Sequence, residues 1–315
     1  MFMLFIVLAY EAVNILFYRQ NEQKDTRISV YGFIIVISCF LQAMFGVVQF
    51  FGFFQISTTL WVTGSFDNPA GFAACLCAGF PFVGFLLSDS NKYIRYVGGL
   101  IGFVIVIAVI LSQSRAGIMS IAFICFILLN MKFFHKRWVK YLSLLCFALL
   151  LSGCYWMKKD SADGRLLIWR CSVSMVKDAP WLGHGIGSFE ARYMDYQADY
   201  FRQYGLNRYS MLADNVKHPF NEYLGVLLNF GFVGLLMILA LITLLIYCYK
   251  KHPCAEKRIA FCSLISIGVF SFFSYTFTYP FTWIVTFLCI IILTKEYIAK
   301  VFTCPIINLN SATLL

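Results

Sequence analysis

The sequence predicts an all-α membrane protein, a polytopic helical bundle of about nine transmembrane helices with one large external loop. Composition is the first observation, since 61% of the 315 residues are hydrophobic and only 13% are charged. With a mean hydropathy of +0.78, the chain has too little polar surface to cover a soluble globule of this length. The second observation is that the apolar residues form runs long enough to cross roughly 30 Å of hydrocarbon. The third is a single long polar stretch, residues 158–219, between those runs.

The apolar runs define the predicted helices in chain order. Six runs make a predicted N-terminal bundle over residues 1–157, the polar stretch 158–219 makes the external loop, and three runs follow within residues 220–315. The expected limits of the helices are 2–18, 29–54, 69–87, 94–112, 116–134, 139–157, 220–249, 257–275 and 277–294.

Lysine and arginine alternate between successive connections, and the positive-inside rule converts this alternation into an orientation. The connections between the clusters carry almost no positive charge apart from Arg115, so they are expected to face outward together with the external loop. In this orientation the N-terminus lies outside, which means that the chain starts outside or that helices upstream of it are missing. The clusters expected in the cytoplasm lie near residues 19–27, 92–95, 132–140, 250–258 and 295–300.

Charge and cysteine content argue against two other classes of protein. The formal net charge of +10 could indicate a nucleic-acid partner, but the cations sit in short clusters between apolar runs and form no basic, aromatic face. Nearly all of the 12 cysteines lie inside apolar runs, where they act as small hydrophobic residues rather than as a disulfide framework. No metal-ligand spacing occurs, so neither a metal nor a cofactor is expected, and the predicted surroundings are membrane lipids.

Arg115 is the clearest charge in an unexpected place, because it lies in a small-residue turn between two strongly apolar helices. A charged side chain near the apolar zone of a membrane is costly and is a functional hypothesis by default. Its guanidinium stays charged and offers a planar fork that suits phosphate oxygens. The alternative is an arginine that extends to the lipid headgroups, and the residue pattern leaves both open.

Two further motifs have mainly structural interpretations. Asp67 or Asn68 can cap the third helix, which Pro69 then begins, and a ligand contact is the less favoured alternative. The glycines at 183, 185 and 187 predict a tight turn rather than a phosphate loop, because no βαβ pattern surrounds them.

Arg165 and Arg170 alternate with apolar residues between 165 and 176, a pattern consistent with an amphipathic helix on the membrane surface. Because they are five positions apart, the two arginines point in different directions on such a helix. Arg165 at the beginning of the helix can face a site, whereas Arg170 is suited to lipid headgroups. The pattern alone favours a solvated or lipid-contacting cation for each.

His218 stands directly before a predicted helix and is followed by Asn221 and Glu222. If all of these residues are helical, His218 and Glu222 lie one turn apart on one face, and the carboxylate can orient the imidazole and raise its basicity. Such a pair is a candidate general base. The alternative is that His218 and Asn221 cap the helix and Glu222 favours its first turn.

A set of short motifs in a fixed order connects these residues. The motifs are Asp67-Asn68-Pro69, Ser114-Arg115-Ala116-Gly117, Gly164-Arg165 with Trp169, Asp178 and Pro180 through Gly183, Gly185 and Gly187 to Phe189, His218 with Asn221-Glu222-Tyr223-Leu224, and Gly231 with Gly234. Their order and their placement around one external loop resemble the O-antigen ligase and O-antigen polymerase superfamily over roughly residues 60–250.

The resemblance implies a multi-pass bacterial inner-membrane enzyme that transfers a glycan from undecaprenyl diphosphate to an acceptor hydroxyl on the periplasmic face. It implies a metal-independent, inverting displacement without nucleotide sugar. By motif, Arg115 and Arg165 would bind the diphosphate, His218 would be the catalytic base, and Glu222 would orient it. Asn221, Asn68 and Arg170 would be supporting residues.

The acceptor stays open in the sequence. O-antigen ligation to lipid A-core in lipopolysaccharide biosynthesis is the favoured interpretation, and the alternatives are a polysaccharide polymerase and a protein O-oligosaccharyltransferase. A lipid-linked glycan transporter is the rival from another class, but the polar groups gather on one face instead of forming a path through the bundle. Members of the superfamily usually have about twelve helices, so the predicted nine are a departure from the family pattern.

Overall fold

The protein is described by a computed structural model over residues 24–53, 62–132 and 159–303, with isolated helical positions between 138 and 156. Within these residues the chain forms helices, turns and connecting segments and no strand, which confirms the all-α prediction. The predicted helix 2–18 and most of the predicted helix 139–157 lie outside the described residues.

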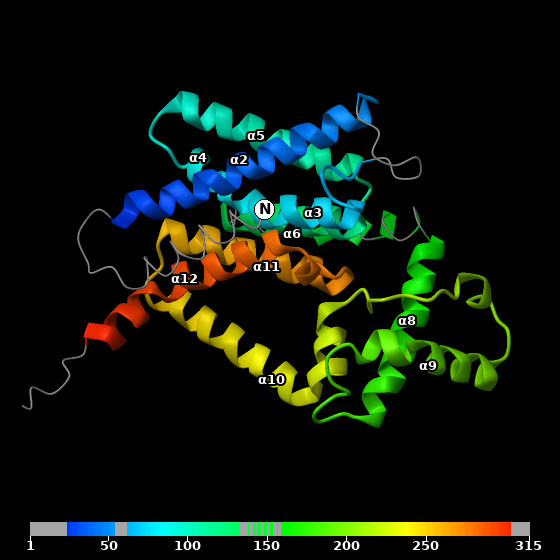
Figure 1. The fold of residues 1–315 in the computed structure, drawn as a ribbon. Coiled ribbons are helices and arrows are strands. Elements are labelled where there is room, and N and C mark those ends of the chain that lie inside the picture. The colour runs from blue at the N-terminus through cyan, green and yellow to red at the C-terminus, as the bar shows by residue number, and fades with distance from the viewer. Residues whose placement is uncertain are drawn as a thin grey trace, which may run out of the picture.

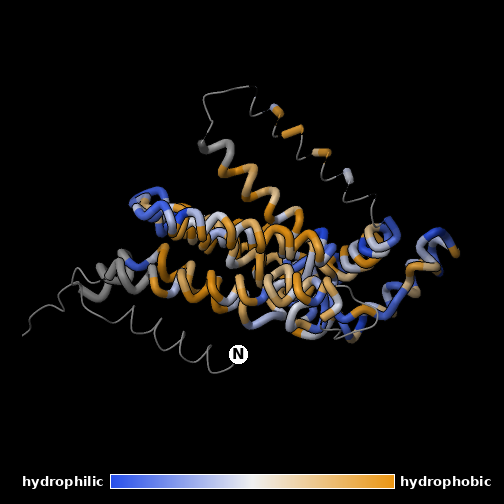
Figure 2. The backbone as a smooth tube through the Cα atoms, turned by 90° about the horizontal axis from the view of Figure 1, so that it is seen from above, coloured by the Kyte–Doolittle hydropathy of each residue, from blue (hydrophilic) through white to orange (hydrophobic). Residues whose placement is uncertain are grey.

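The larger part of the molecule is a bundle of apolar helices that lie side by side (Figure 1). Hydrophobic residues cover most of their length, and hydrophilic residues gather toward the ends of the bundle (Figure 2). Helix α11 is central, since it contacts α3, α6, α10 and α12. The elements of the bundle are α2 (Lys24–Phe50), α3 (Pro69–Gly79), η1 (Phe80–Phe82), α4 (Val83–Leu87), α5 (Lys92–Leu111), α6 (Arg115–Lys132), α10 (Glu222–Lys251), α11 (Ala255–Phe273), η3 (Thr276–Thr278) and α12 (Pro280–Thr303).

Small residues allow α3 to run through the centre of this bundle. Helix α3 has the sequence PAGFAACLCAG, and its residues from Gly71 onward are buried. Serine side chains of α11 close the contact, because Ser263 donates to the Ala78 carbonyl at 2.6 Å and Ser266 to the Cys77 carbonyl at 2.7 Å. Small residues and serine hydroxyls at helix contacts are the usual means of association in an apolar environment.

Membrane-type helices are confirmed by their length and composition. Four helical stretches are long and apolar enough to cross a membrane, and two shorter apolar helices accompany them in the described part of the chain. The predicted total of about nine crossings and the outward side of the loop stay predictions. The four stretches are Val30–Phe50, Pro69–Leu87, Lys92–Leu111 and Glu222–Lys251, and the shorter helices are Arg115–Leu128 and Pro280–Lys295.

A second unit, here named the arm, projects from one end of the bundle (Figure 1). The arm consists of α8 (Lys159–Asp178), α9 (Ser188–Tyr204) and η2 (Ser210–Leu212). It has a small core of its own, which includes Leu167, Met175 and Tyr193 and reaches Leu228 of α10. The amphipathic helix expected over 165–176 is confirmed as α8, whereas α9 was not predicted.

Helix α10 is broken where the arm meets it. Gly231 has non-helical backbone angles, φ 62° and ψ −159°, which interrupt the helix. The turn at 180–185 supplies backbone partners there, since His184 N–H donates to the Leu228 carbonyl at 2.7 Å and Phe232 N–H to the Pro180 carbonyl at 2.8 Å. A break in a membrane helix is tolerated where such partners satisfy the freed backbone groups.

Candidate active site between the arm and the bundle

The predicted site residues converge on one short connection, residues 273–277, between α11 and η3. Arg165 of α8 donates a hydrogen bond to the carbonyl of Phe273 at the start of this segment. Glu222 of α10 accepts from the backbone N–H of Phe277 at the other end, at 2.8 Å. Between these two contacts lies Tyr275, whose ring stacks on His218. Segment 273–277 therefore joins the arm, α10 and α11 at one place.

The two predicted diphosphate-binding arginines lie close enough to affect each other. Burial and, to a smaller extent, the like charge of Arg115 lower the pKa of Arg165 to about 10, while Tyr275 opposes the shift. The guanidinium of Arg165 also lies over the Phe220 ring, 5.1 Å from its centroid. Arg115 begins α6 and donates from Nη2 to Ser161 Oγ of α8 at 2.8 Å. With this pKa, Arg165 remains protonated at neutral pH.

Half-buried Arg165 differs from the solvated cation that its sequence pattern favoured. Two guanidinium groups that repel each other are a costly arrangement in a partly dry place. A bound anion would reverse this cost, because it turns the repulsion into two attractions. The arrangement of Arg115 and Arg165 is thus suited to an anion with several oxygens.

His218 is half-buried and stacks on Tyr275, with 4.7 Å between the ring centroids and 25° between the ring planes. Burial lowers the pKa of His218 below its ordinary value, the carboxylate of Glu190 opposes this shift, and the charge of Lys217 adds to it. The imidazole is therefore neutral at pH 7 and able to accept a proton.

The expected pairing of His218 with Glu222 on one helix is wrong. Helix α10 begins at Glu222, and its N-cap is Asn221, whose Oδ1 accepts from Leu224 N–H at 3.1 Å. His218 therefore lies before the helix, because Pro219 and the left-handed backbone of Phe220, φ 52°, turn the chain. The carboxylate of Glu222 is hydrogen-bonded to segment 273–277 instead of to the imidazole. The capping role that sequence analysis left open for Asn221 is confirmed.

Asn68 has the capping role that the sequence favoured, and it also contacts two tyrosines. It caps α3, since its Oδ1 accepts from Gly71 N–H at 2.9 Å. Its Nδ2 donates to the hydroxyl of Tyr275 at 3.2 Å, and its Oδ1 also accepts from the hydroxyl of Tyr279 at 3.0 Å. Neither tyrosine was predicted as a site residue.

Part of the chain is similar to a known protein family. Residues 100–239 match the family model described as O-antigen ligase. The predicted resemblance to the O-antigen ligase superfamily is confirmed. The family region contains Arg115, Arg165, His218 and Glu222, whereas Asn68 and segment 273–277 lie outside the matched residues. No curated protein matches the chain.

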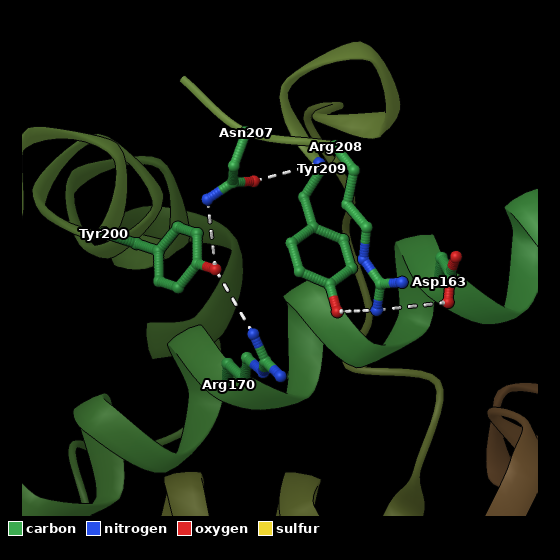
Figure 3. Close-up of polar contacts among 6 residues, drawn as sticks. All are labelled: Asp163, Arg170, Tyr200, Asn207, Arg208 and Tyr209. Atoms are coloured by element: carbon green, nitrogen blue, oxygen red, sulfur yellow. Dashed lines mark hydrogen bonds and ion pairs between the residues drawn. The ribbon is translucent and has the colours of Figure 1, made fainter. Parts of the chain in front are cut away.

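Arg170, predicted as a supporting residue, lies elsewhere in the O-antigen ligase family region. Its Nη1 donates to the Tyr200 hydroxyl at 3.3 Å, and its guanidinium lies over the Tyr209 ring, 5.1 Å from the centroid. Arg208 packs against the same ring and forms an ion pair of 3.9 Å with Asp163 (Figure 3). Arg170 thus joins α8 to α9 and to the chain beyond it, and the predicted difference in direction from Arg165 is confirmed.

The glycine turn also has a structural role in the family region, as predicted. Gly183, Gly185 and Gly187 all have positive φ, between 70° and 90°. His184 between them is fixed by the Met175 carbonyl at 2.7 Å from Nε2 and by Arg192, whose Nη1 lies 3.0 Å from Nδ1. Because the carbonyl only accepts and the guanidinium only donates, Nε2 donates to Met175 and Nδ1 accepts from Arg192.

An apolar cavity of about 600 Å³ opens between α6, α10 and α11. Its lining includes Met119, Tyr223, Gly268, Phe272 and Phe273. The carbonyl of Phe273 is the acceptor of the hydrogen bond from Arg165, so this part of the cavity lining contacts Arg165. The described residues contain no group of three or more His, Cys, Asp or Glu side chains placed to hold a metal ion.

Proposed function

We propose that this protein transfers a glycan from undecaprenyl diphosphate to an acceptor hydroxyl on the periplasmic face of the bacterial inner membrane. The proposed acceptor is lipid A-core, which makes the reaction O-antigen ligation. The observation that carries the proposal is the placement of two arginines where the arm meets the bundle: Arg115 donates to Ser161 of α8, and Arg165 lies one helical turn further along the same helix. The match of residues 100–239 to the O-antigen ligase family model supports glycan transfer as the reaction class.

The proposed role of Arg115 and Arg165 is to bind the leaving group. When the bond between the anomeric carbon and the diphosphate oxygen breaks, the electron pair stays on the diphosphate, which gains negative charge. Two guanidinium groups already in position stabilise this charge without reorganisation during the reaction. Arg165 is held by the Phe273 carbonyl and the Phe220 ring, so its fork is preorganised.

The proposed base is His218. Its neutral imidazole takes the proton of the acceptor hydroxyl as the oxygen attacks the anomeric carbon from the side opposite the diphosphate. One new glycosidic bond forms, one bond to diphosphate breaks, and the anomeric configuration inverts. In this scheme no metal ion takes part, and the sugar–diphosphate bond supplies the driving force.

The apolar cavity supports a lipid-linked donor. Its lining includes Phe273, whose carbonyl accepts from Arg165, and its walls are α6, α10 and α11. Of these, α10 is long and apolar enough to cross a membrane, and α6 is a shorter apolar helix. In the proposed complex the prenyl chain next to the diphosphate lies in this cavity, with the diphosphate at the arginine pair. A donor without a prenyl chain would leave about 600 Å³ of apolar space unfilled.

Transfer by the purified protein in proteoliposomes tests the proposal. The donor is undecaprenyl-diphosphate glycan, the acceptors are lipid A-core, a second lipid-linked glycan or a Ser-containing polypeptide, and released lipid diphosphate and product are both measured. We expect product on lipid A-core, a loss of roughly 100- to 1,000-fold in kcat for Arg165→Ala, and a loss of at least roughly 100-fold for His218→Ala.

Arg170→Ala is the matched control, because this arginine lies on the same helix but contacts Tyr200 and Tyr209. It should retain most of the activity. Equal losses in Arg165→Ala and Arg170→Ala would contradict the role of the arginine pair. Lengthened lipid-linked glycan would assign the chain as a polymerase, and a glycosylated polypeptide would assign it as an O-oligosaccharyltransferase.

A further inference from the structure

We propose that Tyr275 is a positioning residue that fixes the imidazole of His218 for proton transfer. The contact has the geometry of an aromatic stack, with 4.7 Å between centroids and 25° between ring planes. Such pairs are attractive beyond the area that they bury, and a stacked imidazole loses freedom to rotate. The proposal rests on the proposed function, because it takes His218 as the base.

Tyr275 is itself held on two other sides. Asn68 Nδ2 donates to its hydroxyl at 3.2 Å, and Asn68 is fixed in turn as the cap of α3. The Phe220 ring meets it edge to face, with centroids 5.3 Å apart and planes at 68°. A ring with three defined contacts is a rigid support for the imidazole.

The backbone on both sides of Tyr275 is anchored by predicted site residues. Arg165 donates to the Phe273 carbonyl two residues before it, and Glu222 accepts from Phe277 N–H two residues after it. Glu222 therefore acts on His218 through the segment that carries Tyr275. Tyr275 takes the orienting role that sequence analysis gave to the carboxylate.

Coverage by Tyr275 also affects the protonation of His218. The charged groups that act on the imidazole are Lys217 beside it and Glu190 of α9, and Tyr275 lies against its face. Burial lowers the pKa of His218, and removing the Tyr275 ring would admit water and bring this pKa back toward its ordinary value. A base acts in its neutral form, so the acid limb of the pH–rate profile should then move to higher pH.

Three variants separate the effect of losing the Tyr275 ring from the effect of losing its hydroxyl. Tyr275→Leu removes the stack, and we expect kcat to fall roughly 10- to 100-fold while the KM for donor stays within about twofold. Tyr275→Phe keeps the stack and loses the hydroxyl with its contacts to Asn68 and Tyr279, so kcat should fall by no more than roughly fivefold. Tyr279→Phe is the control, because it removes a hydrogen bond to the same Asn68 without touching His218.

A second measurement follows the chemical reactivity of the His218 imidazole and does not depend on glycan transfer. Diethyl pyrocarbonate modifies neutral imidazole, and peptide mapping follows His218 alone as a function of pH. We expect faster modification with a higher apparent pKa in Tyr275→Leu and behaviour close to wild type in Tyr275→Phe and Tyr279→Phe. Unchanged modification of His218 in Tyr275→Leu would overturn the positioning role.

The two measurements distinguish failure of this inference from failure of the proposed function. If wild type transfers glycan and Tyr275→Leu keeps its kcat and pH profile, Tyr275 is not a positioning residue while the proposed reaction stands. If no acceptor is glycosylated but Tyr275→Leu still changes the modification of His218, the stack positions the ring and the assigned reaction is wrong.

Discussion

At the scale of the residue, left-handed backbone marks the two predicted site motifs. The described residues other than glycine with positive φ are Gln113, two residues before Arg115, and Phe220, two residues after His218. Each such conformation costs about 1–2 kcal/mol and persists only where the surrounding contacts determine it. The strained positions thus lie in the turns next to Arg115, which bonds to α8, and next to His218, which stacks on Tyr275.

Substitutions of Glu222 distinguish its observed role, accepting a hydrogen bond from Phe277 N–H, from the predicted role of orienting the imidazole of His218. Glu222→Gln keeps an oxygen that can accept from Phe277 N–H, so we expect stability within about 1 kcal/mol of wild type and nearly full activity. Glu222→Ala leaves that N–H without its acceptor and should lower the free energy of unfolding by about 1–3 kcal/mol, with a clear loss of kcat. Thermal unfolding and transfer assays measure both effects. A large loss in Glu222→Gln would instead support a carboxylate that acts on the imidazole by its charge.

At the scale of the element, hydrophobic runs predicted the helices but not the contacts between them. The runs 94–112 and 116–134 correspond closely to α5 and α6, because length and apolarity alone decide such helices. Helix α9 was missed, since its buried face is made of Phe189, Tyr193 and Gln197 rather than of aliphatic residues.

In the candidate site too, residues with a local sequence signal were predicted, whereas a residue whose contact is distant in the sequence was not. Arg115 was predicted because it is a charge at an unexpected place, and His218 was a candidate base through its spacing from Glu222. The role of Arg165 was predicted only from the motifs that resemble the O-antigen ligase superfamily. Tyr275 was missed because a tyrosine next to an apolar run is typical of a membrane interface. Its contact with Asn68 spans 207 positions, and no local pattern encodes such a distance.

The junction between the glycine turn and the broken helix α10 gives a graded prediction. A Cβ at Gly231 would lie 2.3 Å from the Trp181 carbonyl oxygen and one at Gly183 would lie 2.6 Å from that of Leu228, and both glycines have positive φ. Alanine at either position should therefore destabilise the protein by more than about 3 kcal/mol. Gly187→Ala meets no atom within 4 Å and should cost only about 1–2 kcal/mol for its backbone conformation.

Gly225→Ala is the matched control within α10, because its Cβ would make an ordinary contact of 3.7 Å with Pro219. Alanine is the better helix former, so this variant should be neutral or stabilising by up to about 1 kcal/mol. Unfolding in detergent, followed by tryptophan fluorescence, ranks the four variants. If Gly231→Ala were as stable as Gly225→Ala, the break in α10 would not depend on glycine.

At the scale of the whole molecule, lysines that are expected in the cytoplasm lie at one end of the helical bundle, and the candidate active site lies at the other end. The connections between α4 and α5 and between α10 and α11 lie at the end of the bundle away from the arm (Figure 1). These connections carry Lys92, Lys250 and Lys251, which belong to the clusters expected in the cytoplasm. The arrangement agrees with the orientation in which the arm and segment 273–277 face the periplasm.

Cysteine labelling tests this orientation directly. Cys254, between α10 and α11, is exposed. We expect a membrane-impermeant maleimide to label it only after spheroplasts are lysed, because the positive-inside rule places residues 250–258 in the cytoplasm. In the Cys254→Ser background, which also reports labelling of the other cysteines, Ser174→Cys adds a thiol to α8 and should react in intact spheroplasts. Labelling of Cys254 in intact spheroplasts, and of the Ser174→Cys variant only after lysis, would show that the orientation is the reverse of the one predicted. The proposed site would then lie on the cytoplasmic face.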